Sequence, residues 1–260
     1  NIFVVIFAKN NNNNFIIPVL IASIIPIINF LLVFFYLPET KPDNNLKKPK
    51  PILKNPLKQL FTVFKEEKIR KLSLAFFIYF IAFTGLTNIL IFFLQESLNW
   101  TTKASSGTLV VVGVIAIIVQ GGLIGPLVKE FGEMRLTLIG SGFILIACSL
   151  LITAPKENAI INIYSAVSFL AIGAGLITPT LRALISKKLD VNNQGSILSN
   201  LQGLQSLGGV LGIAMAGRVY DQFGPKSPFI AGSIILIFMI YLIAEGKNNN
   251  LTFHQKTKLS

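Results

Sequence analysis

The sequence predicts an all-α fold, a polytopic bundle of transmembrane helices, on three observations. The mean hydropathy is +0.68, with 52% of the 260 residues hydrophobic and 13% charged, a balance that is not found in ordinary soluble domains. The apolar residues are gathered into runs of about 20, the length at which a helix crosses a hydrocarbon core of roughly 30 Å. These runs lack the period-2 alternation that is typical of a transmembrane β-barrel.

Seven apolar runs have the length of one membrane span each. None carries an acidic residue in its middle third, where a charge costs roughly 2.5–3.5 kcal/mol on insertion scales. A bare apolar octet, residues 1–8, precedes them and is too short to span. We interpret this octet as the end of a helix that began earlier, and the chain as a fragment of a longer protein. The seven predicted spans are 15–37, 72–94, 105–128, 134–153, 160–185, 196–220 and 228–244.

Lysine and arginine are distributed unevenly between alternate loops. One set of loops holds 18 of the 23 basic residues and the other set holds 5; segment 38–71 alone contains ten. The richer set is cytoplasmic under the positive-inside rule. We therefore expect a multi-pass protein of a plasma membrane of the bacterial inner-membrane type, with its C-terminus in the cytoplasm.

The basic segment 38–71 divides the chain. Five prolines in its first half prevent a continuous helix. Its second half places Leu57, Leu60, Phe61 and Phe64 on one helical face, which indicates either a helix on the cytoplasmic membrane surface or a solvated charged linker. The expected divisions are 1–37 (helix end and one complete span), 38–71 (cytoplasmic linker), 72–246 (bundle of six helices) and 247–260 (cytoplasmic tail).

The composition excludes several kinds of chemistry. Cys148 is the sole cysteine and His254 the sole histidine, so a disulfide framework, a zinc site and a buried catalytic triad cannot be built. The spans also lack the paired aspartates of an intramembrane protease. We expect no enzyme, no catalytic residues, no metal and no cofactor. The net charge of +12 lies between apolar runs rather than on a soluble basic face, so we expect the lipid bilayer, not nucleic acid, as the large partner.

Two short segments share one pattern. GPLVKEFGE (125–133) and GRVYDQFGP (217–225) both read Gly-x-x-x-polar-polar-Phe-Gly. They close the second and the fifth span after the linker, on opposite sides of the membrane in the assigned orientation. Three helices followed by three similar helices of opposite direction form an inverted repeat, the construction of many secondary transporters.

Four longer motifs carry a resemblance to a known family: FFYLPET (34–40), GGLIGPLVKEFGE (121–133), GAGLITPTLRALIS (173–186) and NNQGSILSNLQGLQSLGGVLG (192–212). With them the chain resembles the C-terminal half of a major facilitator superfamily transporter, nearest to the tetracycline/multidrug–proton antiporters. The resemblance implies alternating-access transport of a small amphipathic solute or drug, proton antiport, and an N-terminal bundle as the missing partner. The chain departs from the family's loop motif at Lys129 and Glu130, where base and acid are in reversed order.

Two other interpretations fit the span count. The chain could be a truncated, non-transporting half of a transporter, or a seven-helix membrane protein similar to a receptor. The 34-residue linker after the first complete span and the inverted repeat favour the transporter. The sequence upstream of Asn1 would distinguish these possibilities.

Polar residues recur at helical spacing inside several apolar runs. Polar groups in hydrocarbon are costly unless they meet partners or water, so these stripes should face the interior of the bundle. We interpret them as the lining of a solute path; hydrogen bonding between helices is the alternative. The candidates are Thr84, Asn88, Gln95, Tyr164, Ser168, Thr178, Gln202 and Gln205.

Glycine spacing predicts close helix packing. Gly121-x-x-x-Gly125 and Gly208-x-x-x-Gly212 are small-x-x-x-small patterns, which let two helix backbones approach. The runs 134–153 and 228–244 lack such a stripe, and we expect these third helices at the lipid-facing periphery.

The GPLVKEFGE motif predicts a turn and a gate. About five residues separate the two predicted spans, so we expect Gly132 at positive φ, a conformation that glycine adopts without steric cost. Lys129 and Glu130 would project into the cytoplasmic interface, pair with one another or with the facing bundle in one conformation of the transporter, and separate in the other.

Overall fold

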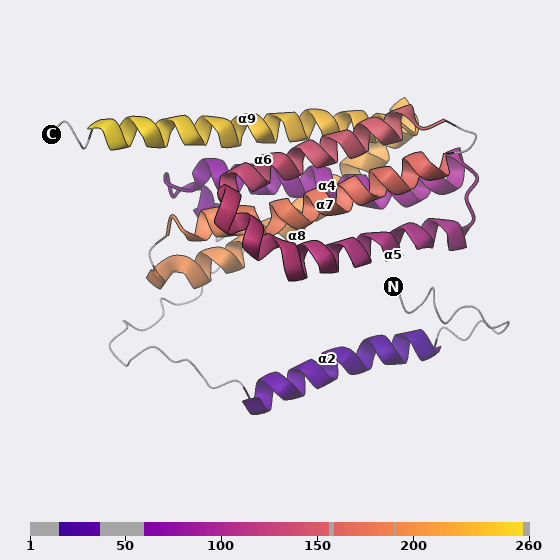
Figure 1. The fold of residues 1–260 in the computed structure, drawn as a ribbon, viewed down its shortest axis with the longest axis horizontal. Helices are drawn as coiled ribbons and strands as arrows, with labels where there is room; N and C mark the ends of the chain where they lie inside the picture. Colours follow the sequence, from indigo (N-terminus) through magenta and orange to yellow (C-terminus); the bar gives the residue numbers. More distant parts are fainter. Residues whose placement is uncertain (1–15, 37–59, 156–158, 190, 257–260) are drawn as a thin grey trace. The chain divides into compact units, whose positions relative to one another are not determined.

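The computed structural model describes residues 16–36, 60–155, 159–189 and 191–256, and every regular element in these ranges is helical (Figure 1). The chain divides into two units, residues 1–54 and 55–260. The first contains α2 (Ile16–Tyr36), a helix of 21 residues. The second contains η1 (Phe61–Phe64), α4 (Arg70–Ser97), α5 (Thr102–Ile118), η2 (Val119–Leu123), α6 (Ile124–Thr153), α7 (Ile160–Ser186), α8 (Val191–Phe223) and α9 (Ser227–Lys256).

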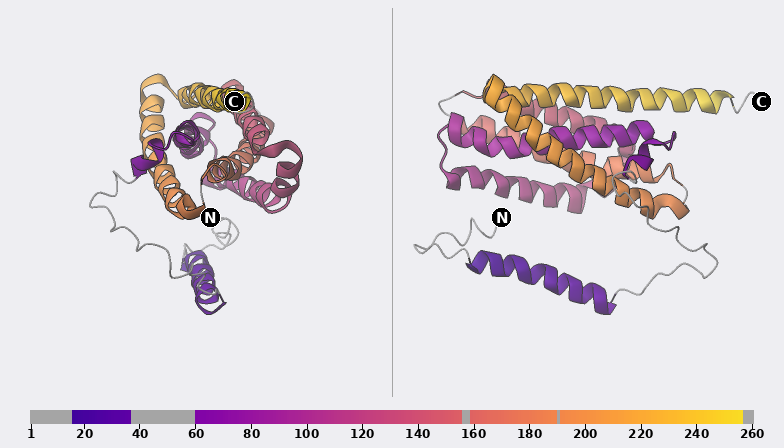
Figure 2. Two further views of the ribbon diagram at one scale, coloured as in Figure 1. Left: turned by 90° about the vertical axis from the view of Figure 1, so that its left-hand side faces the viewer. Right: turned by 180° about the vertical axis from the view of Figure 1, so that it is seen from behind.

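The helices of the second unit form a bundle in which successive helices run in opposite directions (Figures 1 and 2). Four helical stretches in the described residues are long and apolar enough to cross a membrane: Arg70–Ser97, Thr102–Thr153, Ile160–Ser186 and Ser227–Glu245. The second of them is 52 residues long and contains two of the predicted spans. Helix α8 is not among the four, because glycine, asparagine and glutamine lower its hydropathy. The predicted all-α membrane bundle is confirmed.

The packing follows the predicted repeat. Helix α4, the first of one triplet, packs against α8 and α9, the second and third of the other triplet. Helix α7, the first of the second triplet, packs correspondingly against α5 and α6. The end-on view of Figure 2 places α5 and α8 on opposite sides of the bundle. In this exchange of partners, the first helix of each triplet packs against the second and third helices of the other triplet. Two triplets related by a two-fold axis in the membrane plane are expected to pack in this way.

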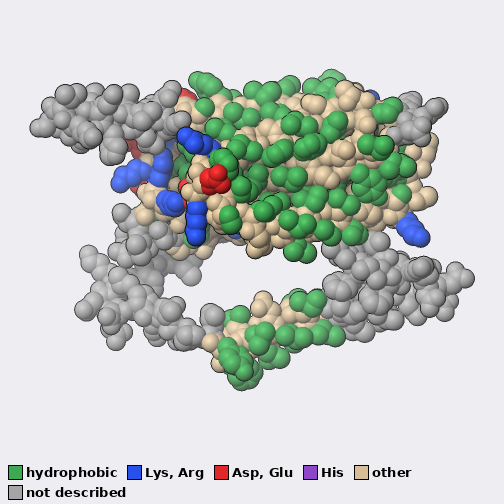
Figure 3. Space-filling view, in the orientation of Figure 1, with side chains coloured by type: hydrophobic (Ala, Val, Ile, Leu, Met, Phe, Trp, Pro, Cys, Tyr) green, Lys and Arg blue, Asp and Glu red, His purple; other side chains and the backbone are tan. Residues whose placement is uncertain are grey.

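The bundle has a dense core and an apolar exterior. Phe76, Tyr79 and Leu181 are fully buried between α4 and its neighbours. On the exterior, Ile117 and Ile234 are 70% and 63% exposed, which is favourable only where lipid, not water, covers them. Figure 3 shows hydrophobic side chains over the face of the bundle that is seen in that view. Lysine and arginine gather at the end where α4 begins and α7 ends.

The turn between the second and third predicted spans differs in part from the expectation. Gly132 has φ 75° and ψ 158°, so the predicted positive φ is confirmed. The predicted span 105–128 is helical throughout but not uniform: α5 ends at Ile118, a π-helical turn follows, and α6 begins at Ile124. Figure 1 shows that the chain bends after α5 before α6 runs back along the bundle, and Gly132 interrupts α6 after the π-helical turn.

The end of the linker packs on the bundle. Residues 61–64 form a single 3-10 turn, and Val63 is 1% exposed. The Phe64 ring lies 6.4 Å from that of Phe77 in α4, and Asn200 in α8 donates to Thr62 over 3.4 Å. The described residues of this segment thus pack on the bundle as a single 3-10 turn; Leu57 lies outside the described part.

The C-terminal end also differs from the expected divisions. Helix α9 continues to Lys256, ten residues into the predicted tail. The bundle's last helix is thus longer than its apolar stretch.

Candidate functional site

Helices α4 and α7, the first of each triplet, meet through a polar contact. The Tyr79 hydroxyl lies 3.3 Å from the Thr178 hydroxyl, and the Tyr79 ring stacks on Phe83 at 5.5 Å between centroids. Tyr79 is fully buried, so its hydroxyl needs the partner that α7 supplies. Thr178 therefore faces the interior of the bundle, as its polar stripe predicts.

Arg182 lies four residues after Thr178 and on the same face of α7. Its Nη2 donates to the side-chain oxygen of Gln202 over 2.7 Å and to that of Gln205. The guanidinium carbon lies 5.9 Å from the centroid of the Phe76 ring. Its Nε is buried and has no hydrogen-bond partner in the described part of the chain. Arg182 on α7 is thus contacted by two neutral amides from α8 and by an aromatic ring from α4.

This arrangement includes one residue that the sequence analysis missed. Gln202 and Gln205 are among the predicted polar candidates, but Arg182 enters the sequence analysis only in the count of basic residues in loops. Its position in the motif GAGLITPTLRALIS, four residues after Thr178, could have identified it. Residues four apart share one face of a helix, so the arginine belongs to the same stripe.

The remaining polar candidates do not join this cluster. Asn88 is exposed and donates to the backbone oxygen of Thr84, its own helix, over 2.9 Å. Ser168 likewise donates to the oxygen of Tyr164 over 2.7 Å, and the Tyr164 ring lies 6.1 Å from that of Trp100. Gln95 is half-buried near the end of α4. Tyr164 and Gln95 thus belong to the end of the bundle opposite Arg182.

The loop motif forms an ion pair through a different acid. Lys129 and Glu130 are exposed, and neither takes part in the two ion pairs of the described residues. Glu133, the last residue of GPLVKEFGE, pairs with Lys187 at the end of α7. The Lys187 hydrogen bond lowers the pKa of Glu133. The motif is therefore attached to α7 by an acid that the sequence analysis did not consider.

The second ion pair lies at the same end of the bundle. Lys71 at the start of α4 contacts Glu245 in α9 over 2.7 Å. One pair thus joins α6 to α7 and the other joins α4 to α9. Both ion pairs therefore hold the first helix of one triplet against the third helix of the other.

The glycine patterns have different outcomes. A side-chain Cβ at Gly212 would lie 2.2 Å from the Ile81 carbonyl oxygen in α4, and one at Gly208 would lie 3.1 Å from that of Phe77. This is the close helix crossing that the pattern predicts. A Cβ at Gly121 or Gly125 would meet nothing within 4 Å in the described residues. Their predicted packing is not formed within this part of the chain.

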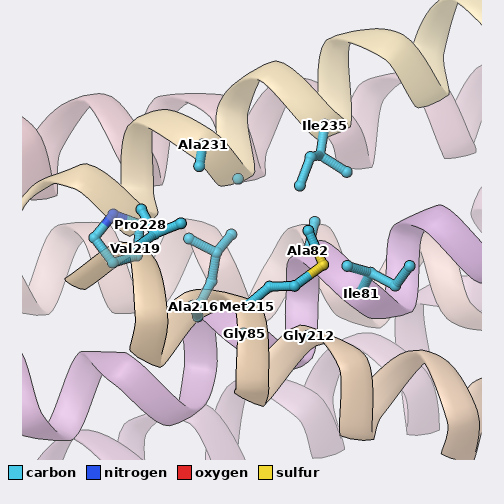
Figure 4. Close-up of a pocket in the computed structure, with 12 residues that line it drawn as sticks. Ile81, Ala82, Gly85, Gly212, Met215, Ala216, Val219, Pro228, Ala231 and Ile235 are labelled. Atoms are coloured by element: carbon cyan, nitrogen blue, oxygen red, sulfur yellow. The ribbon is translucent and has the colours of Figure 1, made fainter. Parts of the chain in front are cut away.

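The crossing borders an apolar cavity of about 40 Å³ between α4, α8 and α9 (Figure 4). Ala82, Met215 and Ile235 project into it beside the glycines, and its lining includes no charged side chain. A space of this size has room for no more than a few water molecules. We assign it to helix packing and not to solute binding.

The described residues contain no group of three or more histidine, cysteine or acidic side chains that could hold a metal ion. The Arg182 cluster itself offers hydrogen bonds and a positive charge, which are means of recognition.

Comparison with known proteins matches residues 11–213 to the family model of the Major Facilitator Superfamily. The class C tetracycline resistance protein of Escherichia coli is 24% identical over 204 residues, 78% of this chain and 50% of that protein. The class H protein of Pasteurella multocida is 28% identical over 131 residues, 50% and 32% of the two chains. Hippocampus abundant transcript-like protein 1 of Bos taurus is 20% identical over 257 residues, 87% and 49%. The chain covers half or less of the length of each.

Proposed function

The chain belongs to the Major Facilitator Superfamily, and from that premise we propose that it forms the C-terminal bundle of a secondary active transporter. The transporter moves a small amphipathic solute or drug across the membrane by alternating access. It is a multi-pass membrane protein, and its proposed location is an inner membrane of bacterial type, with the C-terminus in the cytoplasm.

The observation that carries this proposal is the exchange of partners between the two helix triplets. Helices α4 and α7 each pack against two helices of the opposite triplet, and they meet through Tyr79 and Thr178. In transporters built from repeats, the solute site lies where the repeats meet, and transport is a rocking of one bundle against another. A second, N-terminal bundle is accordingly the proposed partner.

The relatives suggest the first solute to test. Two of them are named for resistance to tetracycline, so tetracycline is the proposed reference solute. Proton antiport is the proposed coupling. The acids of the described bundle, such as Glu96, Glu133 and Glu245, lie between the predicted spans or next to their ends, so we expect the proton-coupling carboxylate in the partner bundle.

The test is uptake by inverted membrane vesicles from cells that express the complete gene product. Energised vesicles should accumulate tetracycline above vesicles from cells without the protein, and a protonophore should abolish the difference. The 260-residue chain expressed alone should insert but transport nothing, because it supplies one bundle. If no tetracycline or other amphipathic solute accumulates at equal protein content, the transporter proposal fails. Accumulation that survives the protonophore leaves transport intact and excludes proton coupling.

A further inference from the structure

Arg182 forms no ion pair with an acidic side chain among the residues that the structure describes. We propose that Arg182, with Gln202 and Gln205, binds an anionic group of the transported solute, a carboxylate or an acid of similar shape. This inference rests on the proposed function and adds a solute class to it: amphipathic molecules with one acidic head.

The placement of Arg182 distinguishes it from Lys71, Lys187 and Arg135, three other basic residues near this end. Lys71 and Lys187 pair with Glu245 and Glu133, whereas the two oxygens that Arg182 contacts are neutral amides. Arg135, which lies near the same end of the bundle, is exposed, where water solvates the charge. Arg182 is half-buried, and its Nε is buried without a partner in the described residues.

The energetics of this arrangement favour an anion. A guanidinium stays protonated at every physiological pH, so it cannot escape the cost of burial by losing its charge. Hydrogen bonds to amide oxygens offset part of the free-energy cost of burying the charge. Charge-assisted hydrogen bonds to a carboxylate offset more of it. One carboxylate oxygen can accept from the Nε–H while the other replaces a glutamine oxygen on Nη2. That two-point contact is the geometry in which arginine recognises planar acids.

The glutamines are suited to both states of such a site. In the described structure their oxygens accept from Nη2. A side-chain amide also carries two donor hydrogens, so rotation by half a turn would present Gln202 or Gln205 as a donor to a bound anion. The two glutamine side chains can therefore hydrogen-bond in both the empty and the occupied site, and the bound anion supplies the partner that Nε lacks in the empty one.

The surface beside Arg182 favours a solute over a lipid tail. Ser199, Gln202 and Ser206 are exposed and follow one another along one side of α8. Farther along the same side Val210 is 67% exposed, so the polar stretch is followed there by an apolar one. Gln202 joins this polar side to Arg182, which shares one face of α7 with Thr178. Arg182 lies near the end of the bundle that is rich in basic residues, where we place the start of the proposed solute path.

The experiment compares two probes of equal shape, radiolabelled 2-naphthoate and neutral 2-naphthamide. Binding is measured on the complete gene product in nanodiscs of phosphatidylcholine, a lipid without net charge. The parent protein should bind naphthoate saturably and more tightly than naphthamide. Arg182→Gln should weaken naphthoate binding about tenfold or more, the value of one lost charge-assisted contact, and leave naphthamide binding unchanged. The matched control Arg135→Gln should change neither.

Two further variants keep the test decisive if Arg182→Gln folds poorly. Arg182→Lys keeps the charge but loses the planar fork, so we expect an intermediate loss of naphthoate affinity. Gln202→Glu places a carboxylate of the protein on Arg182; it should raise the thermal unfolding temperature and exclude naphthoate. Equal binding of the two probes by the parent, or naphthoate binding unaffected by all three variants at Arg182 and Gln202, overturns the proposal.

The alternative ligand is an anionic lipid headgroup, and a separate measurement tests it. Nanodiscs that contain anionic phosphatidylglycerol should leave naphthoate binding unchanged if the site serves the solute. Competition by phosphatidylglycerol that disappears in Arg182→Gln would assign the site to a lipid headgroup and overturn the inference. The proposed function is judged independently: transport of solutes without any anion preference refutes the solute class alone, whereas Arg182-dependent binding without transport of any solute refutes the transporter alone.

Discussion

At the scale of single residues, two carboxylates of one motif differ in what they contact. Glu133 pairs with Lys187, while Glu130, three residues earlier, is exposed. The Lys187 hydrogen bond lowers the pKa of Glu133 below its ordinary value of 4.5. A pKa that is lower in the folded protein contributes stability above the ordinary value, and this contribution is lost as the pH falls through the lowered pKa.

Glu133→Gln should therefore lower the thermal unfolding temperature in detergent at pH 7, by the equivalent of about 0.2–1 kcal/mol, because Lys187 is largely exposed. The difference from the parent should shrink as the pH is lowered below 4.5. Glu130→Gln is the matched control and should follow the parent at every pH. A Glu133→Gln deficit that is constant from pH 7 to pH 3 would show that the ion pair contributes nothing.

Gly132 determines the turn before the third span. Its φ of 75° and ψ of 158° fall in a region that is essentially confined to glycine, where other residues are strained by about 1–3 kcal/mol. Gly132→Ala should destabilise the protein by that amount, and Gly132→Leu should also impair transport by the complete transporter. Gly142→Ala is the control, because its Cβ would meet nothing within 4 Å inside the same helix. Equal unfolding temperatures for Gly132→Ala and Gly142→Ala would contradict the assigned turn.

At the scale of elements, the crossing of α4 and α8 depends on backbone contact. The Ile81 carbonyl oxygen lies where a Cβ of residue 212 would be, at 2.2 Å, and the Gly212 carbonyl lies 2.8 Å from a Cβ at Gly85. Backbone cannot rotate away as a side chain can, so the two helices must separate to admit even a methyl group. The packing between repeats is thus sensitive to single atoms at this position.

Gly212→Ala should destabilise the bundle by about 1–3 kcal/mol, the usual cost of overpacking, although alanine is the better helix former by about 1 kcal/mol. Gly217→Ala on the same helix has no atom within 4 Å of the new methyl group, so the helix preference alone acts and stability should not fall. Unfolding in increasing dodecyl sulfate measures both variants. The crossing is not as close as described if Gly212→Ala proves as stable as Gly217→Ala.

At the scale of the whole molecule, the excess of basic residues in alternate loops predicts the orientation in the membrane. Cys148 is the sole cysteine and is fully buried. Labelling of an engineered cysteine by a thiol reagent can therefore be measured with little background from Cys148. Lys103 at the start of α5 and Glu130 near the start of α6 are both exposed and lie at opposite ends of the bundle.

Lys103→Cys should react with a membrane-impermeant thiol reagent in intact cells, whereas Glu130→Cys should react only after the membrane is permeabilised. The reason is that the loops with 18 basic residues are expected in the cytoplasm. Labelling is measured by the mass shift of the purified protein. The reverse pattern would invert the assigned topology without affecting the fold.

The fold class and the family could be predicted from the sequence because they depend on quantities that accumulate along the chain. The hydropathy of 20 successive residues decides whether a segment enters lipid, and the loop charges decide its direction. The echo of GPLVKEFGE in GRVYDQFGP predicted the inverted repeat. Even Gly132 follows from local geometry, since a short turn between two helices requires a conformation that glycine adopts most easily.

The partners of individual side chains required the tertiary structure. Arg182 meets Gln202 and Gln205 across 20 and 23 residues of sequence, and Glu133 meets Lys187 across 54. Such contacts depend on how far each helix is rotated about its axis and where two helices cross, and neither quantity is encoded in the period of the apolar pattern. For the same reason the spacing of Gly121 and Gly208 looked alike, although only the region around Gly208 lies against another helix in the described part of the chain.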